Sequence, residues 1–154
     1  MIKLKDILLE GKPSSIFVPR RTEDRVERLI KTYIRNGSEG YLDLSEMDLI
    51  ELPEILTYVS VGGGFGCMTN LLTSLKNSPK EIDGNFDCLF NRLTSLKGAP
   101  NSVGGDFDCS HNKLISLEGA PEYVGGNFFC FNNPVKFTEE QVRAVCNVKG
   151  EVFV

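Results

Sequence analysis

The chain of 154 residues contains no tryptophan and only one histidine, His111. A lone histidine is weak evidence for catalysis, because an acid, a base and a nucleophile must lie together to run a reaction. No such group of residues stands out elsewhere in the sequence. We therefore expect a protein that is not an enzyme, and we interpret His111 as a residue of an exposed loop.

Long apolar runs are also missing. No stretch approaches the roughly 20 apolar residues that cross a membrane. Residues 1–10 are charged and lack the small-residue cleavage site of a signal peptide. These features predict a cytoplasmic protein without a membrane partner, and the length of the chain is that of one domain.

Closely spaced cysteine pairs, which mark many zinc sites, are absent. Four of the five cysteines lie 21 residues apart, and stacking on adjacent strands would bring their Cα atoms about 4.8 Å apart, which a disulfide permits. Their side chains would nevertheless run parallel into a core, and a cytoplasmic compartment keeps thiols reduced. We therefore predict buried free thiols, with no metal and no cofactor. The four are Cys67, Cys88, Cys109 and Cys130.

What the sequence does contain is a repeat of 21 residues. Four blocks, at 61–81, 82–102, 103–123 and 124–144, share the pattern V-G-G-x-F-x-C-x-x-N-x-L-x-x-L-x-G-A-P-x-x. A period between 20 and 30 residues indicates units that bury their apolar faces only by stacking on their neighbours.

Each recurring residue type has an expected structural role. Phe and Cys alternate with other residues, which predicts a short strand with its apolar face inward. The Asn column is expected to bond backbone groups of neighbouring coils, and the Gly-Gly pair to permit a turn of positive φ into each strand. The Phe column is at 65, 86, 107 and 128, and the Asn column at 70, 91, 112 and 133.

The run F-x-C-x-x-N-x-L-x-x-L resembles the leucine-rich repeat pattern, with Phe and Cys in the first two leucine positions. The block length and the G-A-P segment are similar to the short repeats of bacterial effector proteins, and the wider sequence resembles small leucine-rich repeat proteins of tailed phages. The resemblance covers roughly residues 40 to 154. It implies an α/β leucine-rich repeat solenoid that serves as a generic binding scaffold.

Two imperfect repeats flank the four regular blocks. Residues 40–52 carry the same offsets with ordinary leucines, and residues 150–154 match the strand frame. Six parallel strands are therefore expected. Five gaps of about 4.8 Å make a strand face about 24 Å long.

Helices are expected to cover both ends of the stack, because an open end exposes core. Residues 1–39 are predicted to form an N-terminal helical cap on a single folding unit that spans 40–154. Its main helix starts at Thr22, and a further small helix is possible within residues 1–10. At the other end Thr138 and Gln141 predict a capping box for a short helix. The predicted apolar stripes are Val26, Leu29, Ile30, Tyr33 and Ile34 in the first helix, and Val142, Val145 and Cys146 in the second.

Charge is unevenly distributed along the chain. Residues 1–39 hold nine Lys or Arg and six Asp or Glu, a net of +3, and the remainder holds eight against fifteen, a net of −7. An acidic repeat region is a poor nucleic-acid binder, so no direct nucleic-acid contact is expected. The basic helix has a chemistry that suits an anionic surface, but its charges alternate with acids, which favours a solvated face. Its basic residues are Arg20, Arg21, Arg25, Arg28, Lys31 and Arg35.

Strand alternation predicts two patches on the outward face. Like charges on adjacent strands repel, and large exposed apolar clusters are uncommon without a partner, so we predict that both patches bind a protein. In the alternative, the acids supply solubility and the Phe residues tuck under the C-terminal helix. The acidic patch contains Asp87, Asp106 and Asp108. The apolar patch contains Phe129, Phe131 and Phe153, with Met68, Leu89 and Phe90 towards the earlier repeats.

The function predicted from these features is a non-enzymatic protein-binding module. If the phage resemblance holds, the expected partner is a host protein, such as a defence component, that the module binds and inhibits or redirects. Two alternatives remain open. One is an acidic mimic of nucleic acid that blocks a DNA- or RNA-binding host protein, and the other is a structural homo-oligomer joined through the apolar patch.

Overall fold

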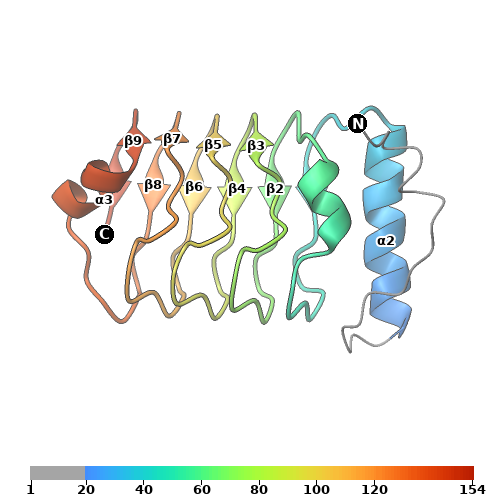
Figure 1. Cartoon of the computed structure of the whole chain (residues 1–154), viewed down its shortest axis with the longest axis horizontal. Coiled ribbons are helices and arrows are strands. Elements are labelled where there is room, and N and C mark those ends of the chain that lie inside the picture. Colours follow the sequence, from blue (N-terminus) through green and yellow to red (C-terminus); the bar gives the residue numbers. More distant parts are fainter. Residues whose placement is uncertain (1–19) are drawn as a thin grey trace.

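The computed structural model describes residues 20–154, which form an α/β fold with two parallel sheets (Figure 1). The helix predicted within residues 1–10 lies outside the described residues. The six-stranded sheet contains β1 (Leu42–Asp43), β2 (Phe65–Gly66), β4 (Phe86–Asp87), β6 (Phe107–Asp108), β8 (Phe128–Phe129) and β10 (Val152–Phe153), in this order. The four-stranded sheet contains β3 (Glu81–Ile82), β5 (Ser102–Val103), β7 (Tyr123–Val124) and β9 (Asn147–Val148).

The repeat sets the strand register. Phe65 of β2 pairs with Phe86 of β4, and Phe86 with Phe107 of β6, so β4, β6 and β8 each lie 21 residues after the preceding strand of this sheet. Each regular block therefore forms one coil, and the coils stack side by side along the molecule (Figure 1). The six parallel strands predicted from the sequence are confirmed. The four-stranded sheet was not predicted.

A column of stacked aromatic rings forms the centre of the core. The ring centroids of Phe65 and Phe86 are 5.6 Å apart, those of Phe86 and Phe107 5.4 Å, and those of Phe107 and Phe128 5.0 Å. All four rings are fully buried. The column confirms that Phe and the alternating Cys face inward.

The predicted Asn ladder is also present. Asn91 accepts a hydrogen bond from the Leu72 amide at 3.0 Å, and its side-chain amide donates to the Cys67 and Cys88 carbonyls. The same contacts recur one coil later at Asn112. The column thus satisfies buried backbone groups between the strand and the chain that leaves it.

The glycine pairs have a different role from the predicted one. They do not adopt positive φ, which occurs instead at other glycines, including Gly98 and Gly119. A Cβ atom on Gly104 would lie 2.2 Å from the Asp83 carbonyl oxygen, and one on Gly125 would lie 2.2 Å from that of Gly104. Glycine is therefore required because neighbouring coils approach each other too closely for a side chain.

The N-terminal end is covered by α2 (Arg20–Arg35), which packs on β1. It begins two residues before the predicted start and buries Val26, Ile30 and Tyr33, as predicted, whereas Leu29 is exposed. The first coil also contains the 3-10 helix η1 (Glu54–Tyr58). Within residues 20–154 no helix has the length and apolar character to cross a membrane.

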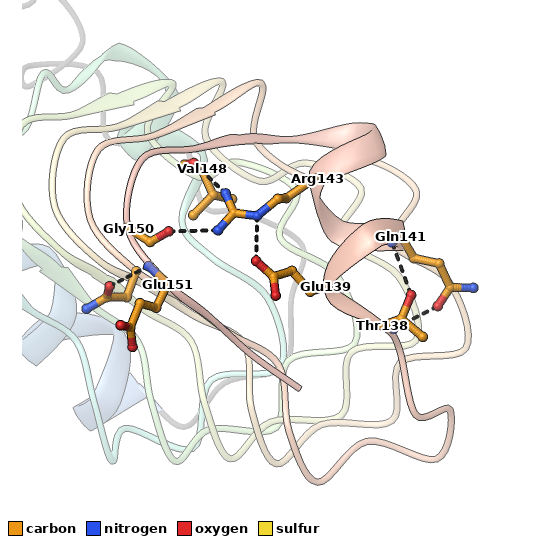
Figure 2. Close-up of polar contacts among 8 residues, drawn as sticks. Thr138, Glu139, Gln141, Arg143, Val148, Gly150 and Glu151 are labelled. Carbon is orange, nitrogen blue, oxygen red and sulfur yellow. Dashed lines mark hydrogen bonds and ion pairs between the residues drawn. The ribbon is translucent and has the colours of Figure 1, made fainter.

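The C-terminal helix α3 (Glu139–Val145) begins with the predicted capping box. The Gln141 amide donates to the Thr138 hydroxyl at 3.2 Å, and the Thr138 amide donates to the Gln141 side chain at 2.9 Å (Figure 2). Val142 and Cys146 are buried, but Val145 is half exposed. The prediction that Val145 faces the core is therefore wrong.

Arg143 of α3 satisfies backbone carbonyls of the last coil. Its guanidinium donates to the carbonyls of Val148 and Gly150 at 2.8 and 2.9 Å, and Glu139 holds it in place (Figure 2). In the preceding coil the equivalent carbonyls, of Val124 and Gly126, accept backbone amides. The Arg143 side chain thus supplies to the last coil the hydrogen-bond donors that the backbone amides of the next coil supply elsewhere.

Candidate binding face

The outward positions of the six-stranded sheet form a continuous face. We define the binding face as the two outward positions of each strand region, together with the two positions that come after the buried Leu or Cys that ends each of the first five strand regions. The central column, in strand register, contains Asp43, Gly66, Asp87, Asp108, Phe129 and Phe153. The column before it contains Tyr41, Gly64, Asn85, Asp106, Asn127 and Glu151, and the two that follow contain Ser45, Met68, Leu89, Ser110 and Phe131, then Glu46, Thr69, Phe90, His111 and Asn132. Of these columns, Gly64, Gly66 and Ser110 are buried.

Five rings on this face contact one another in series, and we call them the aromatic ladder. Phe90 stacks on His111 with ring centroids 4.2 Å apart, and His111 and Phe131 meet edge to face with ring centroids 5.5 Å apart. Phe131 contacts Phe129 at 6.5 Å, and Phe129 stacks on Phe153 at 4.7 Å. The structure thus joins four of the predicted apolar site residues into one array.

The aromatic ladder remains open to solvent. Phe90 is 50 % exposed and Phe153 is 40 % exposed, whereas Phe129 and Phe131 are half-buried. Each ring covers part of its neighbour, so their flat surfaces are held in fixed positions. Offset stacked and edge-to-face pairs of this kind stabilise a cluster by about 0.5–1.5 kcal/mol each beyond area burial.

His111 lies in a loop, as predicted, but it is not fully exposed. It is half-buried between Phe90 and Phe131, and Nε2 lies 3.2 Å from the side-chain amide of Asn132. Stacking between adjacent coils depends on the strand register. The sequence signal was available, since His111 occupies the same repeat position as Phe90.

Phe90 occupies a strained backbone conformation. Its φ of 54° lies in the left-handed region, as does that of Thr69, His111 and Asn132 at the same repeat position. Asn tolerates this region, but a bulky ring there is a genuine outlier. The chain therefore places a large, half-exposed aromatic side chain where folding alone favours Asn or Gly, and such strain clusters at functional sites.

Met68 and Leu89 precede the strained position in their coils, as Phe131 does in its own. Both side chains are half-buried. Their main chains link neighbouring coils, because the Thr69 amide donates to the Leu89 carbonyl at 3.1 Å. They extend the apolar surface towards the earlier coils, next to the predicted acidic patch.

Tyr41 forms the floor of the face at its N-terminal end, and sequence reasoning missed it. Its ring lies over Gly64 and Gly66, where added Cβ atoms would lie 2.5 and 2.4 Å from the ring and hydroxyl. The hydroxyl donates to Asp87 at 2.7 Å. The two glycines therefore make room for a tyrosine from the first coil, a signal visible as glycine at two strand positions that carry side chains in later coils.

Each predicted acid has a polar contact within the protein. Asp106 accepts the Asn127 amide at 2.6 Å, as Asn85 accepts the Asp106 amide at 2.9 Å. Asp108 accepts the Ser110 amide at 2.8 Å. Asp106 thus belongs to a second side-chain ladder between coils and has a structural role. The prediction that it binds a partner has no separate support from these contacts.

Asp87 and Asp108 face outward on neighbouring strands, in direct register. Partial burial raises the pKa of the Asp87 carboxyl above its ordinary value, the hydrogen bond from Tyr41 lowers it, and the charges of Asp108 and Asp106 raise it. Since proximity and burial both disfavour two carboxylates here, folding gains nothing from keeping them charged.

The cysteines contribute packing to the core below the face. All five are free and buried, as predicted for the four in the repeat. Burial raises the pKa of Cys130 and of Cys146 to about 11, so neither is a ready nucleophile. Among residues 20–154 no three His, Cys, Asp or Glu side chains come together to hold a metal ion.

The basic helix α2 presents a solvated surface. Arg25, Arg28 and Arg35 are exposed, and Lys31 pairs with Glu27 one turn earlier. These contacts agree with the solvated helix face that the charge pattern favours.

No protein-family model matches the chain, and no curated protein or solved structure matches it either.

Proposed function

We propose that the chain is a non-enzymatic protein-binding module, built as a short-repeat leucine-rich solenoid, that holds its partner on the binding face. The observation that carries the proposal is the aromatic ladder, in which Phe90 keeps a strained backbone while half of its side chain is exposed. Folding alone does not account for that combination, but recognition does.

The size of the face agrees with a protein partner. A standard interface buries about 800 Å² on each partner, which is most of a strip about 24 Å long. Aromatic anchors supply most of the affinity in such interfaces, and charges at their side chiefly set orientation and association rate. The aromatic ladder and the Asp87–Asp108 pair fit these two roles.

The sequence resemblance adds a proposal about the source of the partner. If the chain acts as the similar phage proteins are expected to act, the partner is a host protein, and a defence component is one candidate. Lysate from a candidate host, passed over the immobilised chain and analysed by mass spectrometry, identifies the partner. A captured protein supports the proposal only if a variant that lacks a ring of the aromatic ladder captures less of it.

Two variants then test the face with the identified partner by surface plasmon resonance. Phe131→Ala is expected to weaken binding by at least about 1 kcal/mol, chiefly through faster dissociation. The double variant Asp87→Asn with Asp108→Asn is expected to slow association and reduce its salt dependence. Asn retains the acceptor that Tyr41 and the Ser110 amide use, so both variants should fold.

Ile115→Ala is the control variant, because Ile115 is 66 % exposed and lies outside the face. It should bind like the unaltered chain. If Phe131→Ala and the double Asn variant also bind like the unaltered chain, the partner contacts another surface and the proposal fails.

A further inference from the structure

The binding face carries charge of one sign. Its positions include six acids, namely Asp43, Glu46, Asp87, Asp106, Asp108 and Glu151, and not one of the 17 Lys and Arg residues of the chain. With His111 neutral, six acids and no bases give a formal charge of −6, whereas the whole chain carries −4. The face is therefore more negative than the protein to which it belongs.

Among the side chains that the structure describes, residues 25–154, no Lys or Arg forms an ion pair with these carboxylates. The ion pairs among residues 20–154 join Lys31 to Glu27, Lys97 to Glu118, and Arg143 to Glu139. All three lie off the face. Partial burial raises the pKa of Asp87, and the charges of Asp108 and Asp106 raise it further. A cationic partner would supply the missing charge.

The arrangement of acids and rings favours one kind of cation. Asp108 lies in direct register with Phe129, whose ring stacks on that of Phe153. A guanidinium is planar, pairs with a carboxylate through two donors, and stacks on an aromatic face. A lysine ammonium can form the ion pair but has no flat surface to stack. Neighbouring carboxylate and ring therefore fit arginine better than lysine.

We infer that the binding face takes an extended, arginine-bearing segment of a protein partner, with guanidinium groups placed between the Asp87–Asp108 pair and the Phe129 ring. The inference rests on the proposed function, because it names the chemistry of the segment that this function requires. At about 3.4 Å per residue, a strip about 24 Å long matches roughly seven extended residues.

Three synthetic peptides of ten residues test the inference by fluorescence anisotropy. They alternate glycine with arginine, lysine or citrulline, the last being an uncharged analogue of arginine with nearly the same shape. The arginine peptide should bind at least tenfold more tightly than the citrulline peptide and several-fold more tightly than the lysine peptide. Its affinity should fall as salt is added.

Variants of the chain place the peptide on the face. Asp87→Asn with Asp108→Asn, and separately Phe129→Ala, should each weaken arginine-peptide binding at least tenfold. The control, Glu81→Gln with Glu122→Gln, also removes two charges, but from exposed positions off the face. It should change affinity less than twofold, and circular dichroism should show that all variants are folded.

The inference is overturned if the arginine peptide binds no better than the citrulline peptide, or if the control weakens binding as much as the Asn pair. If this happens while Phe131→Ala still loses the captured protein, the proposed function stands and only the chemistry of the segment is wrong. If light scattering instead shows a dimer that the face variants convert to a monomer, the occupant is a second copy, and the inference is again wrong.

Discussion

Replacing Phe107 by alanine removes a ring from the middle of the buried aromatic column. Phe107 is fully buried, with the rings of Phe86 and Phe128 at 5.4 and 5.0 Å on its two sides. An aromatic side chain buries about 150–250 Å², which at about 25 cal/mol per Å² corresponds to about 4–6 kcal/mol. Allowing for what alanine retains, we expect a loss of about 3–5 kcal/mol in the free energy of unfolding.

Urea denaturation followed by circular dichroism measures this loss, since the chain has no tryptophan to report by fluorescence. A domain of this kind has a total stability of about 5–15 kcal/mol, so the alanine variant approaches the limit of folding. Phe107→Leu keeps most of the apolar volume and should lose less, which preserves a measurable transition.

Phe90→Ala is the matched control for this prediction. The same ring is removed from a position that is 50 % exposed, and alanine keeps the strained backbone, so a loss of about 2 kcal/mol, roughly half that of Phe107→Ala, is expected. A loss below about 1 kcal/mol for Phe107→Ala, or equal losses for the two variants, would show that the inward and outward faces have been exchanged.

Further predictions concern the strained position, the acidic pair and the thiols. Phe90→Asn should be more stable in urea than Phe90→Ala by about 1 kcal/mol, because both variants lose the ring but Asn tolerates positive φ as Asn132 does, while partner binding falls; equal stability of the two variants would show that the backbone at this position is not strained. The pKa of Asp87 is higher in the folded chain than in the unfolded chain, where it has the ordinary value of about 3.9. The contribution of Asp87 to the free energy of unfolding is therefore fully present below the ordinary value and is lost as pH rises through the folded pKa. Asp87→Asn should therefore gain stability relative to the unaltered chain between pH 3 and pH 7, and a constant difference across that range would contradict this. At pH 8 the native chain should react slowly with a thiol reagent, since the pKa of Cys130 and Cys146 is about 11, and five thiols should react after unfolding; rapid native labelling would show that the core opens.

The coil and its core follow from the repeat because the same residue type returns every 21 positions. Phe107 and Asn112 occupy positions where four copies agree, and a shared inward position leaves few alternatives for a strand. Thr138 and Gln141 likewise predict α3 from a local contact within four residues. The buried columns depend on residues that are identical in neighbouring coils, and the capping box depends on residues close together in one coil. Both kinds of feature can therefore be predicted from the sequence pattern.

The four-stranded sheet could not be recognised in the same way. Each of its strands presents one buried side chain, such as Val124 in Tyr123–Val124, with a glycine two residues later, so no alternation is visible. In the six-stranded sheet, by contrast, buried Phe128 is followed two residues later by buried Cys130. The prediction that the glycine pairs adopt positive φ is wrong for a related reason. Their role depends on the distance between adjacent coils, as for Gly104 against Asp83, and not on local φ.

The candidate face was predicted as columns, but its contacts were not. Phe129 and Phe153 stack because β10 joins the sheet in register with β8, which the pattern indicated. The stacking of His111, the position of Tyr41 over two glycines and the structural bond of Asp106 depend on side-chain directions between coils. These directions are set by packing and are not visible in residue spacing.

Hydroxyl-radical footprinting in the presence of the captured partner tests the central claim, that the outward face of the six-stranded sheet is the binding surface. Phe90 lies on this face and is 50 % exposed, and Tyr58, at the end of η1 and off the face, is 51 % exposed. In the free chain both aromatic side chains are accessible to label. Addition of the partner should sharply reduce labelling of Phe90 and leave Tyr58 unchanged, whereas protection of Tyr58 with Phe90 still labelled would place the binding surface elsewhere.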